Sequence, residues 1–255
     1  MSDIFASELL KVRSVRSSYA LLAVVGAMLA LGVVMVIGMT VDFDHSSAAE
    51  QAKFAGADAS VIVIPFTQFC FAAFGALAIT AEVGSGMIRP SLVAVPRRRS
   101  MIAGKVAVVG GLTLVFGQLV AFAAYLVSRL IAGGHPAPLW PYDSTSDGVR
   151  MALSNGVSIL VLGLVGLGVG MLVRSTAGAL ITIVGLLLIL PTVAFFLPDP
   201  WGPRVSRVML SNLAPQLSGT ADTGVMPPVW AAVTMAAWVL VALGAGAVAF
   251  FRRDP

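Results

Sequence analysis

Six long runs of apolar residues, separated by shorter polar segments, account for most of the chain. An α-helix rising 1.5 Å per residue needs roughly 20 apolar residues to cross about 30 Å of hydrocarbon. The pattern therefore predicts an all-α, polytopic membrane protein whose six transmembrane helices form a single transmembrane domain over residues 1–255. The runs contain no charged side chain and cover residues 19–39, 61–81, 106–128, 151–173, 175–197 and 229–251.

The segment before the first run also shows helical spacing. Phe5, Leu9 and Val12 recur about one turn apart, and the segment lacks Gly and Pro. This spacing predicts an amphipathic helix over residues 1–18, lying on the cytoplasmic membrane surface with its cations toward anionic lipid. A frayed tail whose cations only fix the topology is the alternative.

A loop over residues 198–228 precedes the last run and is rich in proline. Within it, Val205, Val208 and Met209 stand at helical spacing, which favours a short re-entrant helix over residues 204–213 in the outer leaflet. Just before this loop, Pro191 removes a backbone donor and predicts a kink near the outer end of the fifth helix.

Glycines cluster in the fourth run, at Gly163, Gly166, Gly168 and Gly170. Small residues on one face let helix backbones approach closely, and such packing drives helix association in lipid. Packing within the chain is favoured here over contact with a second copy.

Charge is scarce, and its distribution predicts the topology. Charged residues make up 11% of the chain, against about 25% in a soluble domain. With a cytoplasmic amino terminus, eleven of the sixteen Lys and Arg residues fall inside and eight of the twelve acids fall outside. Because basic residues favour the cytoplasmic side, both termini are predicted to be cytoplasmic.

Several kinds of chemistry lack a motif in this sequence. No Gly-x-x-x-x-Gly-Lys-Ser/Thr loop is present, so ATP hydrolysis by this chain is not expected. His45 and His135 fall in separate outer loops and Cys70 lies inside the second run, so we predict no catalytic residue and no metal site. The basic residues do not alternate with aromatic ones, so nucleic acid is not an expected partner.

The segment between the second and third runs, residues 82–105, gathers cations around one acid, Glu82. Gly84, Gly86, Pro90 and Pro96 interrupt it. One interpretation is a compact cytoplasmic protrusion whose arginines dock in a cleft of a soluble protein. The other is a charge cluster that stops translocation and binds anionic lipid. The residues alone favour neither.

The stretch AEVGSGMIRPSLVAVPRRRSMIAGK resembles a pattern found in permease subunits of the type-2 class of ABC exporters. That pattern has an acid, a Gly-Thr-x-Arg motif, a small apolar run, Pro-x-Arg and a later Lys. The leading SELLKVRSVRSSY and the closing FFRRDP are similar to the same family, although Met87 stands where Thr is common and Pro90 is unusual. The residues that carry the resemblance are Glu82, Gly86, Ile88, Arg89, Leu92, Pro96, Arg97 and Lys105.

The resemblance implies a permease that dimerises with a second permease copy in a bacterial inner membrane and pairs with two separate ATPase subunits. ATP and Mg²⁺ would then bind to the partner, with no cofactor in this chain. The second and fifth spans are implied to form the translocation path, lined by Gln68, Phe69, Phe74 and Pro191. The residues implied to couple the permease to the ATPase are Glu8, Lys11, Arg13, Glu82, Gly86, Arg89, Pro96, Arg97, Arg98, Arg99 and Lys105.

Two other function classes stay open. A secondary transporter or channel needs no ATPase, but typically shows intramembrane charge or an internal repeat, and neither is evident in this sequence. A membrane scaffold, including a permease-like immunity protein that binds without transporting, is the third class. The sequence does not identify a cargo.

Overall fold

The computed structural model describes residues 7–11, 16–86, 98–220 and 226–252. Over these residues every regular element is helical, and six helical segments are long and apolar enough to cross a membrane. The predicted all-α, six-span architecture is confirmed. The segments are α2 (Arg16–His45), α4 (Ser60–Gly84), α6 (Arg98–Ala132), α7 (Thr145–Val173), the composite of α8 (Thr176–Val184), η1 (Gly185–Ile189) and α9 (Leu190–Phe195), and α12 (Pro228–Arg252).

Several helices extend beyond the apolar runs that predicted them. The first run ends at residue 39 but α2 continues to His45, and the third run covers 106–128 whereas α6 extends from Arg98 to Ala132. An apolar run marks where the chain lies in hydrocarbon, while backbone hydrogen bonding continues into the polar turns beyond it. The spans were therefore predicted correctly, but the predicted residue ranges are shorter than the helices.

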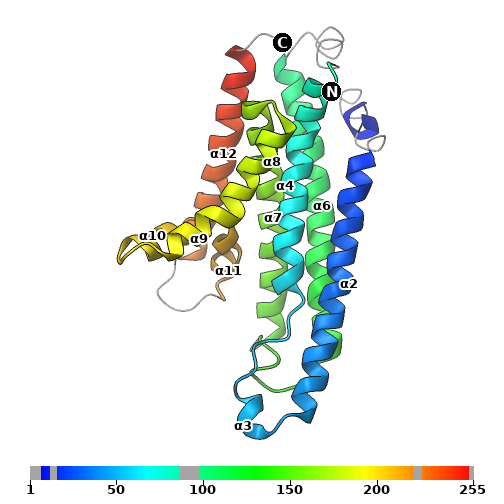
Figure 1. Ribbon diagram of the computed structural model, residues 1–255, viewed down its shortest axis with the longest axis vertical. Helices are drawn as coiled ribbons and strands as arrows, with labels where there is room; N and C mark the ends of the chain where they lie inside the picture. Colours follow the sequence, from blue (N-terminus) through cyan, green and yellow to red (C-terminus); the bar gives the residue numbers. More distant parts are fainter. Residues whose placement is uncertain (1–6, 12–15, 87–97, 221–225, 253–255) are drawn as a thin grey trace.

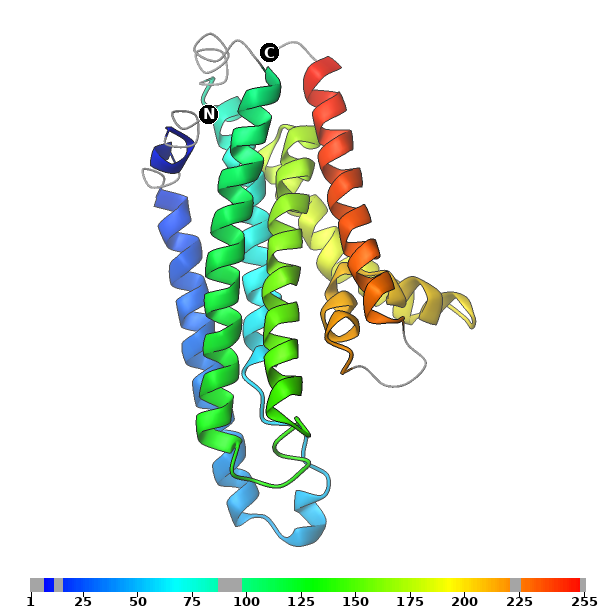
Figure 2. The same ribbon diagram turned by 180° about the vertical axis from the view of Figure 1, so that it is seen from behind.

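Helices α4 and α7 lie in the middle of the bundle, with α2 on one side and α12 on the other (Figures 1 and 2). Glycines allow the close contact between α4 and α7. A Cβ atom added to Gly166 would lie 1.9 Å from the Ala72 carbonyl oxygen, and one added to Gly75 would lie 2.0 Å from that of Gly163. The glycines of α7 thus serve packing within the chain, as predicted.

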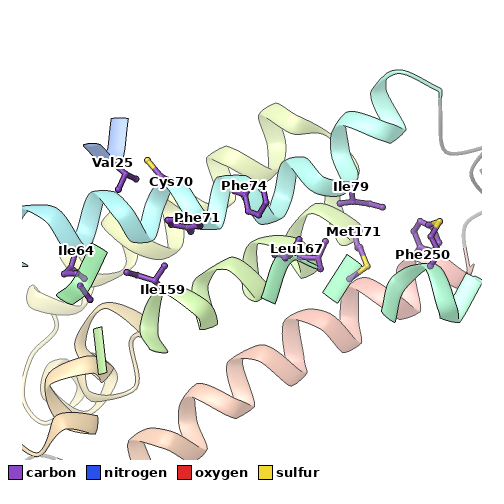
Figure 3. Close-up of a cluster of buried hydrophobic side chains, with 13 residues drawn as sticks. Val25, Ile64, Cys70, Phe71, Phe74, Ile79, Ile159, Leu167, Met171 and Phe250 are labelled. Atoms are coloured by element: carbon purple, nitrogen blue, oxygen red, sulfur yellow. The ribbon is translucent and has the colours of Figure 1, made fainter. Parts of the chain in front are cut away.

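Buried apolar side chains tie the central helices to their neighbours. The cluster in Figure 3 joins Val25 of α2, Cys70 and Phe71 of α4, and Ile159 and Leu167 of α7. Cys70 is a buried free thiol within this cluster, as expected of a small core residue.

The fifth span is irregular. Its middle is a π-helical turn, η1, and Pro191 lies in the first turn of α9 directly after it. Because Pro191 has no N–H, the carbonyl of Leu187 loses its usual α-helical partner, which fits the widened turn before it. The irregularity predicted from Pro191 is confirmed. Figure 1 shows α9 and α10 (Trp201–Arg207) projecting sideways from the bundle.

The loop before the last span contains short helices, but not one helix over residues 204–213. The chain forms α10, the 3₁₀ turn η2 (Leu210–Asn212) and α11 (Leu213–Ser218) in succession. Met209 is extended and buried, and Leu210 and Leu213 are also buried. Burying these side chains requires the backbone to turn, so the single helix expected from apolar spacing is broken.

The two ends of the bundle differ in charge. The basic end comprises helix 7–11, the first turns of α2 and α6, and the last turns of α4, α7 and α12, with Lys11, Lys105, Arg174 and Arg252. The opposite, acidic end comprises the last turn of α2, α3 (Ala48–Gln51), residues 52–59 and residues 133–147. Its acids are Asp42, Asp44, Glu50, Asp58, Asp143 and Asp147. In Figure 1 the basic end is at the top.

Candidate functional site at the basic end

Four charged side chains from three separate segments meet at the basic end. The Lys105 ammonium donates to Glu8 Oε2 at 2.8 Å, to Glu82 Oε1 at 2.7 Å and to the Ala78 carbonyl at 2.9 Å. The Lys11 ammonium donates to Glu8 Oε1 at 2.8 Å and to Glu82 Oε1 at 3.0 Å. We call Glu8, Lys11, Glu82 and Lys105 the ion network.

Local helical structure places each member of the ion network. Glu8 and Lys11 are three residues apart in helix 7–11, so their side chains share one face. Glu82 lies in the last turns of α4, which gives way at Gly86 to a left-handed residue with φ +72°, a conformation that glycine adopts without strain. Lys105 lies in the second turn of α6. Helix 7–11 is therefore fastened to both α4 and α6.

Three of the four side chains of the ion network are buried, and its formal charges cancel. Lys105 is 2% exposed, while Glu8 and Glu82 are each 6% exposed. Taking an ion out of water costs several kcal/mol, so buried charges need close partners. Two carboxylates and two ammonium groups cancel here, and all three Lys105 protons have acceptors. Removing one of the buried members would leave a buried charge without its balancing partner.

Charge pairing also determines the protonation of the helix 7–11 residues. Burial alone raises the pKa of Glu8, but the charges and hydrogen bonds of Lys105 and Lys11 outweigh burial and lower it. Burial lowers the pKa of Lys11, and the hydrogen bonds and charges of Glu8 and Glu82 raise it above its ordinary value. Both groups are held in their charged forms.

One carboxylate oxygen of the ion network has no hydrogen-bond donor within the described residues. Glu82 Oε1 accepts from both lysines, whereas Glu82 Oε2 is buried and makes no hydrogen bond within the described residues. A buried carboxylate oxygen without a donor is costly. Chemically, the site is a set of ion pairs that joins three segments and leaves one carboxylate oxygen without a hydrogen bond. No group in it is arranged as a nucleophile with an adjacent base.

The structure brings together four of the residues named for coupling, namely the members of the ion network, and it buries three of them. Gly86 and Arg99 lie on the exposed surface of the basic end. The remaining residues or their side chains lie outside the described part of the chain: Arg13, Arg89, Pro96, Arg97 and the side chain of Arg98, as well as Ile88 and Leu92.

The residues named for the translocation path do not share one surface within this chain. Gln68 is 4% exposed and donates to Ser158 Oγ of α7 at 2.8 Å. Phe69 packs against a buried cluster that includes residues of α4, α7, α8, α11 and α12, whereas Phe74 lines the pocket shared with α2 and α6. Pro191 is half-buried in α9.

Sequence reasoning missed a second link at the basic end. Arg174 ends α7 in a left-handed conformation, donates to the Phe250 carbonyl of α12 at 3.2 Å and stacks over the Phe250 ring. Nearby, Thr176 donates to Thr80 of α4 at 3.1 Å. The sequence offered only one signal, a lone arginine between two apolar runs, and that was used for topology alone.

Neither a scan against protein-family models nor a search among curated proteins finds a match to this chain. The structure shows a membrane protein with six spanning helices and a buried ion network at its basic end.

Proposed function

We propose that the chain is the membrane-spanning permease subunit of an ATP-driven exporter of the type-2 ABC class. In this proposal it forms the translocation path with a second permease copy, and two separate ATPase subunits bind at the basic end. The protein would lie in a bacterial inner membrane with both termini cytoplasmic. ATP and Mg²⁺ would bind to the partner.

The observation that carries the proposal is the position of the ion network at both ends of residues 82–105. Glu82 begins this segment and Lys105 ends it, and their side chains are joined at 2.7 Å. Helix 7–11 is fastened to the same two residues through Glu8 and Lys11. A force applied to residues 82–105 would therefore reach α4, α6 and helix 7–11 together.

This geometry suits mechanical coupling better than direct recognition by a partner. Three of the four network side chains are buried, so they are not available to bind an ATPase surface. In the proposal, the ATPase contacts the exposed part of residues 82–105, and the ion network transmits the movement to the helices. The two roles can be separated by mutation.

The exposed apolar faces support both bilayer and permease contacts. Helices α2, α12 and the fifth span are mostly exposed, whereas α4 and α7 are mostly buried. On the fifth span the exposed side chains include Ile181, Leu188, Ile189, Val193, Phe195 and Phe196. The described spans carry no charge near their middles, which favours a hydrophobic or amphipathic cargo.

The experiment begins by identifying whether a neighbouring open reading frame encodes a phosphate-loop ATPase, which is then co-expressed and purified with this chain. In liposomes, Glu82→Gln should uncouple ATP turnover from transport of a fluorescent amphipathic dye by about 5-fold or more. The complex should stay assembled, because Glu82 is buried. Arg89→Ala should instead weaken ATPase binding, because it removes a charge from the proposed contact.

Glu50→Gln, at an exposed acid of the acidic end, is the matched control and should leave both readouts unchanged. Normal coupling in Glu82→Gln together with normal binding in Arg89→Ala would defeat the proposal. Dye transport driven by a proton gradient in liposomes that contain only this chain would identify a secondary transporter. Co-purification with a partner lacking ATPase activity, without transport, would identify a scaffold.

A further inference from the structure

An apolar pocket of about 450 Å³ opens between helix 7–11, α2, α4 and α6. This volume lies in the range of small-molecule sites, which is about 300–1,000 Å³. The pocket is separate from the ion network and from the glycine contact between α4 and α7. Its walls include Leu9 of helix 7–11, Leu22 and Val25 of α2, Cys70 and Phe74 of α4, and Phe116 of α6.

The pocket extends from the membrane surface toward the middle of the bilayer. Ser18 and Tyr19 line it in the first turn of α2, and Val25 lines it roughly 10 Å further along that helix. Cys70 and Phe116 lie near the middles of α4 and α6. The pocket is therefore deep along the bundle axis, in the leaflet at the basic end.

Its polar groups are confined to one end. Among the lining side chains that the structure describes, Ser18 and Tyr19 alone carry hydroxyl groups, and both are at the basic end. The deeper walls are aliphatic, aromatic or thiol groups, which offer no strong partner to water. The distribution matches an amphiphile whose head lies at the membrane surface and whose chain lies inside.

The side of the pocket faces outward from the bundle. Tyr19 is 59% exposed, Leu22 is 38% exposed and Phe116 is 36% exposed, so its rim is continuous with the surface of the transmembrane helices. In a bilayer this rim borders hydrocarbon, and lipid is the most abundant molecule that can enter. An apolar cavity left empty would forfeit the dispersion contacts of its lining atoms.

We propose that this pocket holds one acyl chain of a bilayer phospholipid from the leaflet at the basic end, and that this chain helps seat helix 7–11 on the bundle. Leu9 closes the pocket from helix 7–11, so a chain in the pocket packs against that helix. Glu8, one residue away, fastens the same helix through the ion network. The acyl chain and the ion pairs then hold helix 7–11 together against the bundle.

The test uses the full chain in nanodiscs of phosphatidylethanolamine and phosphatidylglycerol, with a trace of phosphatidylglycerol carrying a diazirine in one acyl chain. After illumination, crosslinked peptides are mapped by mass spectrometry. We expect crosslinks at the pocket walls about tenfold above those on the exposed face of α12, the ratio given by 1.4 kcal/mol. Even labelling of all exposed faces would overturn the proposal.

Two variants fill the pocket from different walls, Leu22→Trp from α2 and Leu112→Trp from α6. Each should reduce pocket crosslinks about tenfold. Leu31→Trp, on an exposed part of α2 outside the pocket, should leave them unchanged. Unreduced crosslinking in both pocket variants, each folded as judged by size-exclusion profile, would also overturn the proposal.

The wild-type crosslink map decides the question even if a variant fails to fold. The experiment contains neither ATP nor an ATPase, so its result is independent of the proposed transport function. A protein that exports nothing could hold this lipid, and an exporter could leave the pocket unoccupied.

Discussion

The two ends of the bundle each bury a polar cluster, and the clusters are built differently. At the basic end, four formal charges from helix 7–11, α4 and α6 neutralise one another. At the acidic end, a single carboxylate, Asp58, accepts from neutral donors. These are the Tyr142 hydroxyl, the Ser128 hydroxyl at 3.4 Å and the Ser60 backbone N–H at 2.8 Å.

The two clusters hold different elements of the fold in place. Asp58 lies directly before α4, and Ser128 Oγ accepts from the Ala59 backbone N–H at 2.9 Å, so the acidic cluster fixes the start of one helix against α6. The ion network instead fastens helix 7–11 to both α4 and α6. Loss of Glu8 and Lys11 would leave the Glu82–Lys105 pair to stand alone. We therefore expect the acidic end to keep α4 fixed against α6, and the basic end to release helix 7–11 when its ion pairs are broken.

The largest effect is expected from Lys105→Met. Removing this ammonium leaves the buried carboxylates of Glu8 and Glu82 with only Lys11 to balance them, and breaking a buried pair in this way costs about 3–5 kcal/mol. The thermal unfolding midpoint of the detergent-solubilised protein should fall accordingly. Lys53→Met removes an exposed lysine from the acidic end and should change the midpoint little. Equal midpoints in the two variants would contradict the importance assigned to the ion network.

Asp58→Ala should have the next largest effect. It leaves the Tyr142 hydroxyl and the Ser60 N–H without their acceptor, a loss of about 1–3 kcal/mol, while the Ser128 hydroxyl keeps the Ala124 carbonyl as its acceptor at 2.8 Å. The cost is smaller than for Lys105→Met because no charge is left unbalanced. Asp143→Ala, at an exposed neighbouring acid, is the control for the same unfolding measurement. A greater loss in Asp58→Ala than in Lys105→Met would reverse the ranking of the two ends.

Acidification should release the basic end without mutation. The folded pKa of Glu8 is depressed, so its contribution is present above the ordinary value of 4.5 and is lost as the pH falls through the folded pKa. The raised pKa of Lys11 means that its contribution is present below 10.5 and is lost only as the pH rises through the folded pKa. Helix 7–11 should therefore stay docked at neutral pH and detach in acid below 4.5.

A fluorophore on Leu10→Cys, an exposed site in helix 7–11, reports this release through its polarisation in a Cys70→Ala background. The same labelled protein carrying Glu8→Gln should show low polarisation already at neutral pH. Unchanged polarisation across the acid range would show that other contacts hold the helix.

The spans and their packing face were predictable because they depend on local patterns. An uncharged run of about 20 residues identifies a membrane helix by itself, and the glycines of α7 indicate close contact through their size alone. The ends of α2 and α6 were not predictable in this way, because the hydrogen bonds that extend them are insensitive to hydrophobicity.

For the site, the sequence predicted which residues take part but not how their side chains pair. Resemblance selected Glu8, Lys11, Glu82 and Lys105, but the pairing of Glu8 with Lys105 spans 97 positions and follows from helix packing. Gln68 and Phe74 point in different directions within this chain because residues six apart differ by about 240° around an α-helix, and their predicted place on a path formed with a second copy stays a prediction. Gln68 therefore faces α7, and Phe74 faces the apolar pocket between helix 7–11, α2, α4 and α6.

The smallest effect is expected from Tyr142→Phe. Asp58 keeps its donors Ser128 and Ser60 in this variant, so the loss should be about 1 kcal/mol. Burial and the nearby Asp58 carboxylate raise the pKa of the Tyr142 hydroxyl above its ordinary value of 10.0. Its stabilising contribution is thus present below pH 10.0 and is lost as the pH rises from there toward the folded pKa.

Comparing wild type with Tyr142→Phe isolates this contribution, because Lys11 titrates alike in both. The difference between their unfolding midpoints should be constant up to pH 10.0 and shrink above it. A constant difference through the alkaline range would mean that the hydroxyl does not bind Asp58 as a proton donor. In that case Tyr142 would not count among the neutral donors to Asp58, and the acidic cluster would differ less from the ion network than described above.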